Sequence, residues 1–201
     1  MYQFHEDDLE QATLEWLEEL GYETLHGPDI AVDGEYPERD SYQEVVLHDR
    51  LEEALRKINP SASSSSIERA IQFVTMIESP SLIVNNRNFQ KFVTDGIDIE
   101  YRTDDGRNAT EKLWLFDFEN MNNNDFVAVN QFTVIEGQNN KRPDVVVFVN
   151  GLPLVVIELK SSTNEQAGIT EAFRQIQPYN RAIPSLFNYN TFLVISDGVN
   201  A

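Results

Sequence analysis

Three charged residues stand at the ends of two apolar stretches in the second half of the chain. Asp144 comes directly before the first stretch, and Glu158 and Lys160 close the second. Two carboxylates in a small space repel each other, and the pKa of one rises unless a cation lies between them. Mg²⁺ binds through one or two carboxylates together with water and phosphate oxygens. The three residues therefore indicate a site where two acids and an amine surround a divalent cation.

A plainer interpretation of these charges is structural. Glu158 and Lys160 are two residues apart, so on a strand both side chains point to the same face. An ion pair that emerges into solvent at the end of a buried strand would explain both. The two interpretations differ in whether Asp144 lies beside Glu158.

The spacing of the residues allows this question to be examined. A two-residue turn at Asn150–Gly151 sets Asp144 opposite Ile157, and Glu158 then points to the other face. A shift of one residue pairs Asp144 with Glu158, with Cβ atoms about 4.5–5.5 Å apart. The metal site therefore requires a three-residue connection or a bulge, and Pro153 is a plausible cause of one.

The hairpin itself is well specified. The apolar runs 145–149 and 152–157 are nearly continuous, which is typical of central strands buried on both faces. Asn150–Gly151 between them favours a type I′ turn. Further strands are expected at 97–102, 111–118, 125–137 and 190–198, and the whole stretch 81–120 has a β-like pattern.

Amphipathic patterns predict helices at 6–23, 41–59, 66–78 and 163–183, the last breaking near Pro178. In the first helix Gly21 is the expected C-cap, and in the second Ser41 and Glu44 form a capping box. The apolar stripe of the first helix comprises Leu9, Ala12, Leu14, Trp16, Leu17 and Leu20. The order of elements predicts an α/β fold with a central mixed sheet flanked by helices.

The composition is acidic and lacks cysteine. The chain has 201 residues with 15 basic and 34 acidic side chains, a net charge of −19, and residues 1–60 hold 17 of the acids and only 4 of the bases. This charge argues against tight independent binding of DNA. The absence of cysteine excludes a disulfide framework and favours a cytoplasmic location. Neither a signal peptide nor a membrane helix is expected.

The charged residues and their surroundings resemble a known group of enzymes. Pro143-Asp144, then thirteen residues, then Glu158-Leu159-Lys160 resemble the PD-(D/E)xK nuclease superfamily, and a core like that of restriction endonucleases is implied. The stretches "DFVAVNQF", "RPDVVVFVNGLPLVVIELK" and "QIQPY" resemble the N-terminal nuclease region of the R (HsdR) subunit of prokaryotic type I restriction enzymes. The similarity covers most of the chain and is strongest over 96–198.

The resemblance implies Mg²⁺-dependent hydrolysis of DNA phosphodiesters. It assigns the metal to Asp144 and Glu158, with the carbonyl of Leu159 as a further ligand. It assigns to Lys160 the orientation or deprotonation of the attacking water.

Other site residues follow from the resemblance alone. A Gln-x-x-x-Tyr motif corresponds to Gln175 and Tyr179, although a solvated glutamine and a packing tyrosine would be the structural alternative. The superfamily places an acid on its first helix, for which Glu10 is the choice and Glu6 and Glu15 are rivals. A surface acid on an acidic helix is the alternative there.

The resemblance also sets the expected scope of the chain. We expect one nuclease domain over 1–201, with a helical acidic part over about 1–80 and a catalytic core over about 81–201. R subunits are ATP-driven DNA translocases, and no P-loop occurs here, so motor domains are expected in further sequence. The expected partners are double-stranded DNA and the modification (M) and specificity (S) subunits, and no membrane. A stand-alone repair or resolvase-type nuclease and a non-catalytic docking module are the alternatives.

Overall fold

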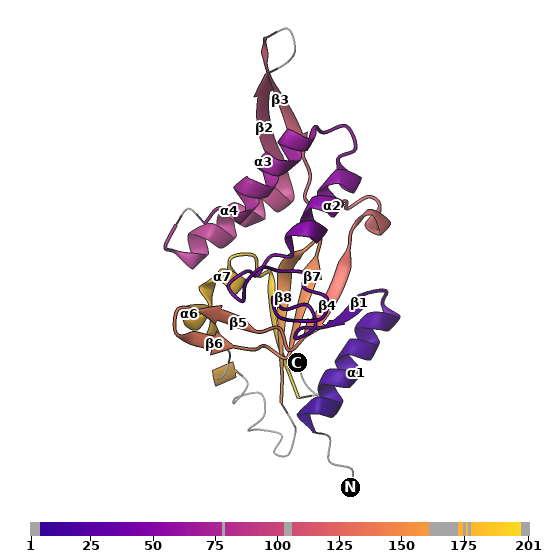
Figure 1. Ribbon diagram of the computed structural model, residues 1–201, viewed down its shortest axis with the longest axis vertical. Coiled ribbons are helices and arrows are strands. Elements are labelled where there is room, and N and C mark those ends of the chain that lie inside the picture. The colour runs from indigo at the N-terminus through magenta and orange to yellow at the C-terminus, as the bar shows by residue number, and fades with distance from the viewer. Residues whose placement is uncertain are drawn as a thin grey trace.

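The computed structural model describes residues 5–77, 79–102, 106–160, 173–174, 176 and 178–197. A five-stranded mixed sheet forms its centre, in the order β1-β4-β7-β8-β9 (Figure 1). The outer pairs, β1 with β4 and β8 with β9, are parallel, and the inner pairs are antiparallel. These strands are β1 (Glu23–His26), β4 (Phe126–Asn130), β7 (Val145–Val149), β8 (Leu152–Leu159) and β9 (Phe192–Ser196). The prediction of an α/β fold with a mixed sheet flanked by helices is confirmed.

Hydrophobic side chains cover both faces of this sheet. On one face, α1 (Glu6–Glu19) packs Leu14 and Leu17 against Val145 and Val147 of β7. Alternate residues of the same strand, Val146 and Phe148, belong to the larger cluster on the other face. The continuous apolar run of β7 thus reflects burial on both sides, as predicted. Of the helices in the described residues, none is both long and apolar enough to cross a membrane.

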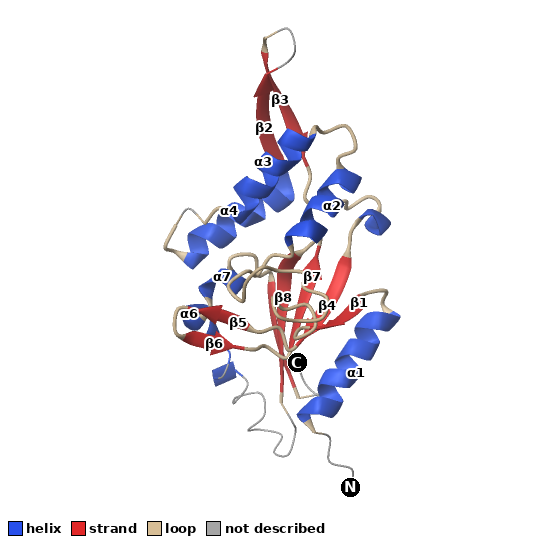
Figure 2. Cartoon of the chain, viewed as in Figure 1, coloured by secondary structure: helices blue, strands red, loops and turns tan. Residues whose placement is uncertain are grey.

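A lobe of three helices and a hairpin extends from the sheet, with the hairpin projecting farthest (Figure 2). It comprises α2 (His48–Ile58), α3 (Ser64–Thr75), α4 (Leu82–Asp95), β2 (Ile97–Arg102) and β3 (Asn108–Leu113). Buried residues of this lobe continue into the larger hydrophobic cluster of the sheet. Short elements complete the fold: η1 (Met121–Asn123), β5 (Val134–Glu136), β6 (Asn139–Lys141), α6 (Tyr179–Ala182) and α7 (Pro184–Phe187).

The turn between β7 and β8 has the predicted form. Asn150 and Gly151 have φ angles of 53° and 73°, both positive as a type I′ turn requires. The fully buried Asn150 side chain accepts a hydrogen bond from the N–H of Asp125 and donates to the carbonyl of Leu115. A Cβ on Gly151 would lie 2.3 Å from the carbonyl oxygen of Leu47, so glycine is required by space as well as by φ.

The strands that follow this turn are offset by one residue. Next to the turn Val149 pairs with Leu152, but after an irregularity Val147 pairs with Val155. Leu154 is therefore the additional residue of a β-bulge, one position after Pro153. The bulge that the metal hypothesis requires is present.

The second helix begins seven residues later than its pattern predicts. Residues 41–47 are not helical, and α2 starts at His48. Instead Val45, Val46 and Leu47 are buried in the core, and the Leu47 N–H donates to the carbonyl of Gly151. The expected capping box at Ser41 is wrong because burial of these three apolar residues outweighs local helix preference.

Two further expectations are wrong. Residues 82–95 form α4, whereas the β-like pattern of 81–120 suggested extended chain. Phe89 is buried and Phe92 and Val93 pack on the core, a spacing of three to four residues that suits a helix. Trp16 of α1 and the C-cap residue Leu20 are 61% and 75% exposed, so the stripe that packs on the sheet is narrower than predicted.

Candidate functional site

The offset pairing brings the two predicted acids together at one end of the sheet. Val145 pairs with Ile157, and the same register, extended by one residue, sets Asp144 beside Glu158. Residues that face each other across two strands carry their side chains on the same face. Glu158 is fully buried. The N–H of Leu159 donates a 2.7 Å hydrogen bond to Oδ2 of Asp144, which holds this carboxylate against β8.

The Asp144 carboxylate lies in surroundings that oppose its charge. Burial raises the pKa of Asp144, and the nearby carboxylates of Glu10 and Glu6 raise it further. The hydrogen bond from Leu159 and the ammonium of Lys160 act in the opposite direction but are outweighed. A cation at this position would relieve the repulsion among the acids.

Lys160 lies near these carboxylates at the end of β8. The main-chain N–H of Lys160 donates to the carbonyl of Ser196, which extends the pairing between β8 and β9. Its Nζ lies 3.1 Å from Oε1 of Glu6 in the first turn of α1. The amine is therefore held between a helix carboxylate and the acid pair, and its charge lowers the pKa of Asp144.

Of the three candidate acids on α1, Glu6 and Glu10 approach the site and Glu15 does not. Nδ2 of Asn130 donates a 2.8 Å hydrogen bond to Oε1 of Glu10, and Nε2 of Gln131 donates to Oε2. Both amides stand at the end of β4, beside the start of β7. Glu15 is exposed and accepts from Gln11 one turn earlier on the same helix.

The Gln-x-x-x-Tyr motif is described only in part. Gln175 lies outside the described residues. Most of the helix expected over 163–183 lies outside the described residues as well. Tyr179 begins α6, and Pro178 is its N-cap. The Tyr179 ring is buried in the larger cluster, and Nζ of Lys141 lies 5.5 Å from its centre. This burial matches the structural alternative for the tyrosine and leaves the role of the motif as a prediction.

The donor atoms at this end of the sheet fit a hard divalent cation. Asp144, Glu158 and the carbonyl of Leu159 supply oxygen, the ligand type that Mg²⁺ prefers. Across the residues that the structure describes, no three acidic or histidine side chains form a ready-made metal cluster. Mg²⁺ commonly keeps several water ligands, so two carboxylates and a main-chain oxygen are a sufficient protein contribution.

Comparison with known proteins identifies the family. Residues 3–201 match the family described as "Type I restriction enzyme R protein N terminus". The chain belongs to this family. It is 42% identical over 199 residues to the HindI endonuclease subunit of a type I restriction enzyme from Haemophilus influenzae, which covers 98% of this chain and 19% of that protein.

Two other relatives agree with this assignment. The EcoprrI endonuclease subunit from Escherichia coli is 40% identical over 101 residues, 48% of this chain and 30% of that sequence. The SauMSSORF170P endonuclease subunit from Staphylococcus aureus is 30% identical over 192 residues, 95% of this chain and 18% of that protein. This R-protein N terminus spans about a fifth of the length of the curated relatives that match nearly all of it.

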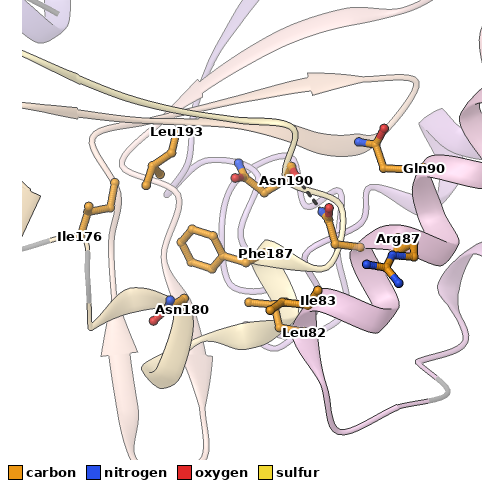
Figure 3. Close-up of a pocket in the computed structure, with 10 residues that line it drawn as sticks. Leu82, Ile83, Arg87, Gln90, Ile176, Asn180, Phe187, Asn190 and Leu193 are labelled. Carbon is orange, nitrogen blue, oxygen red and sulfur yellow. Dashed lines mark hydrogen bonds between the residues drawn. The ribbon is translucent and has the colours of Figure 1, made fainter.

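A cavity of about 540 Å³ lies elsewhere on this R-protein N terminus, between α4 and α7 (Figure 3). Its walls combine apolar side chains with amides and one arginine, Arg87. Nδ2 of Asn86 donates a 2.7 Å hydrogen bond to the carbonyl of Asn190 across it. Of the predicted site residues that the structure describes, none lines this cavity, so it is separate from the acid pair.

Asn130 and Gln131 are the site residues that we did not predict from the sequence. Both fall within the stretch "DFVAVNQF", which supports the resemblance. The available signal was the change from four apolar residues to two amides at the end of a predicted strand. That signal does not reveal the partner, because Glu10 is 120 residues away in sequence.

Proposed function

We propose that this chain is the DNA-cleaving domain of a type I restriction enzyme R subunit, with a PD-(D/E)xK site. The observation that carries the proposal is the bulge in the β7–β8 hairpin, because it sets Asp144 beside Glu158. The membership of the family agrees with an endonuclease role. A plain two-residue hairpin would have separated the two acids.

Asp144, Glu158 and the carbonyl of Leu159 would hold Mg²⁺. Bound there, Mg²⁺ would supply Lewis-acid polarisation of a phosphoryl oxygen and acidification of water. The two carboxylates fix the position of this charge at the end of the sheet. The hydrogen bond from the Leu159 N–H orients the Asp144 carboxylate.

Lys160 would act on the attacking water and on the phosphate. A positive charge at the end of β8 would stabilise the charge that grows on a phosphate. Its present partner Glu6 is half exposed, so the ammonium can exchange this ion pair for a phosphate oxygen. Gln175 and Tyr179 remain candidates for contacts with the same phosphate, and Glu10 for a supporting role on the metal side.

Other parts of the restriction enzyme would supply most of the affinity for DNA. A net charge of −19 opposes strong binding of DNA by the domain alone. We propose that ATP-driven motor domains of a full-length R subunit, together with the M and S subunits, bring double-stranded DNA to the site in the prokaryotic cytoplasm. The 201-residue chain by itself should bind duplex DNA weakly, and nanomolar affinity at physiological salt would contradict this division of roles.

Cleavage of DNA by the reconstituted enzyme tests the proposal. With Mg²⁺ and ATP present, Asp144→Asn in the R subunit should reduce double-strand cleavage by more than about 100-fold. Asp98→Asn is the matched control, since Asp98 is an exposed acid of β2 that pairs with Lys112. Translocation, followed as ATP hydrolysis that depends on DNA, should continue in both variants.

Calorimetric titration of the chain with Mn²⁺ or Mg²⁺ separates a nuclease from a docking module. The unsubstituted chain should bind the ion and Asp144→Asn should not. Unimpaired cleavage by Asp144→Asn would refute the proposed site. The absence of any binding by the unsubstituted chain would favour a docking module.

A further inference from the structure

Glu10 is held by two amides in a way that fixes its position relative to the acid pair. Asn130 donates to one carboxylate oxygen and Gln131 to the other. Both oxygens of Glu10 therefore already accept a hydrogen bond from the protein.

The backbone that presents these amides adopts an uncommon conformation. Gln131 has a φ of 54°, in the left-handed region that residues other than glycine, asparagine and aspartate seldom occupy. Such conformations persist only where the surrounding structure fixes them, and they cluster at functional sites. The N–H of Gln131 donates 2.9 Å to the carbonyl of Asp144, so the same residue contacts both Glu10 and the main chain of the acid pair.

Gly27 packs against the main chain of Asn130 and Gln131. Its N–H donates a 2.8 Å hydrogen bond to the carbonyl of Asn130. A Cβ at position 27 would lie 2.6 Å from the carbonyl oxygens of both Asn130 and Gln131. The backbone at Gly27 therefore passes the main chain of Asn130 and Gln131 more closely than any residue with a side chain would allow. The main chain of Asn130 and Gln131 has little freedom to relax.

We propose that Asn130 and Gln131 are positioning residues that hold the Glu10 carboxylate beside Asp144, where it strengthens cation binding without coordinating the ion. This inference rests on the proposed metal site. If Asn130 and Gln131 served only to attach α1 to the sheet, one hydrogen bond to an uncharged group would be enough. Two donors, one on each oxygen, fix both the position and the orientation of the Glu10 carboxylate.

The affinity for Mn²⁺, measured by calorimetry on the 201-residue chain, tests the inference. Gln131→Gly removes the amide and suits the positive φ, so the fold should be retained. Gln131→Gly, Asn130→Ala and Glu10→Gln should each weaken Mn²⁺ binding by about 10-fold. The double variant Glu10→Gln with Gln131→Gly should bind no more weakly than Glu10→Gln alone, because the amide acts through the carboxylate.

Gln11→Ala is the matched control. It removes an amide that donates 3.1 Å to a carboxylate of the same helix, Glu15, away from the site. Its Mn²⁺ affinity should be unchanged. The melting temperature of each variant, measured without metal, shows whether a change in affinity follows from loss of structure.

The outcomes distinguish this inference from the proposed function. Mn²⁺ binding that is lost in Asp144→Asn but unchanged in Gln131→Gly and Asn130→Ala would overturn the positioning role and leave the metal site intact. Additive losses in the double variant would overturn the claim that the amide acts through Glu10. No binding by the unsubstituted chain would overturn the metal site and the positioning role together.

Discussion

Two substitutions of Asp144 separate its hydrogen bond from its charge. Oδ2 of Asp144 accepts from the N–H of the buried Leu159 at 2.7 Å. Alanine would leave this donor without a partner, which costs about 1–3 kcal/mol. In a protein of this size each kcal/mol shifts the melting temperature by about 2–4 °C. Asp144→Ala should therefore lower the melting temperature by about 2–12 °C in the absence of divalent cations.

Asparagine should behave differently because it keeps the acceptor oxygen and removes the charge. The pKa of Asp144 is raised in the folded protein, chiefly by burial, so the folded state binds this proton more tightly than the unfolded state does. The contribution of Asp144 to stability consequently falls as the pH rises from the unfolded pKa through the folded pKa. Above that range Asp144→Asn should melt at or above the temperature of the unsubstituted chain.

Thermal melts followed by circular dichroism, from pH 4 to pH 8 with a chelator present, measure this difference. At a Mg²⁺ concentration of 100 times its dissociation constant, the free energy of unfolding of the unsubstituted chain should rise by about 2.7 kcal/mol. That of either variant should not change. An Asp144→Asn variant that melts as low as Asp144→Ala at pH 8 would refute the account of the hydrogen bond and the burial.

Three further substitutions probe the scaffold, each by denaturant titration. Gly151→Ala should lose at least about 2 kcal/mol, because its Cβ would meet the Leu47 carbonyl at 2.3 Å and its φ is positive. Arg39→Met should change stability by no more than about 1 kcal/mol. Nε and Nη2 of the buried Arg39 have no hydrogen-bond partner among the described residues, Nη1 donates a long bond of 3.3 Å to the Glu44 carbonyl, and the guanidinium lies 4.0 Å from the centre of the Phe132 ring. Arg50→Ala should cost about 2 kcal/mol at pH 7, because it removes the ion pairs of Arg50 with Glu23, Glu38 and Asp125.

The hairpin shows what could be predicted from the sequence. Its turn residues, its buried strands and the need for a one-residue offset follow from alternation and from the positive φ that Asn-Gly accommodates. These rules are local, and they place Asp144 beside Glu158 once a bulge is assumed. The position of the bulge at Leu154 depends on packing against neighbouring strands, and the sequence offers only Pro153 as a hint.

The wrong predictions concern segments whose conformation depends on contacts with residues far away in the sequence. Residues 45–47 follow a helical pattern, yet the close approach of Leu47 to Gly151 requires extended chain. Residues 82–95 contain Asn-rich stretches that look unlike a helix, but burial of Phe89 on one side favours one. The partnership of Glu10 with Asn130 and Gln131 likewise joins the first helix to a strand that only the fold brings near.

The offset at Leu154 also governs how the length of this hairpin can vary. Adding or deleting one residue between Phe148 and Val155 would reverse the parity of the alternation, whereas a change of two would restore it. Sequences that lengthen or shorten the loop by an even number can therefore keep their acids adjacent, while odd changes need a second, compensating shift. Counting residues in this short segment, more than comparing their types, tells whether a related hairpin can still bring two carboxylates to one ion.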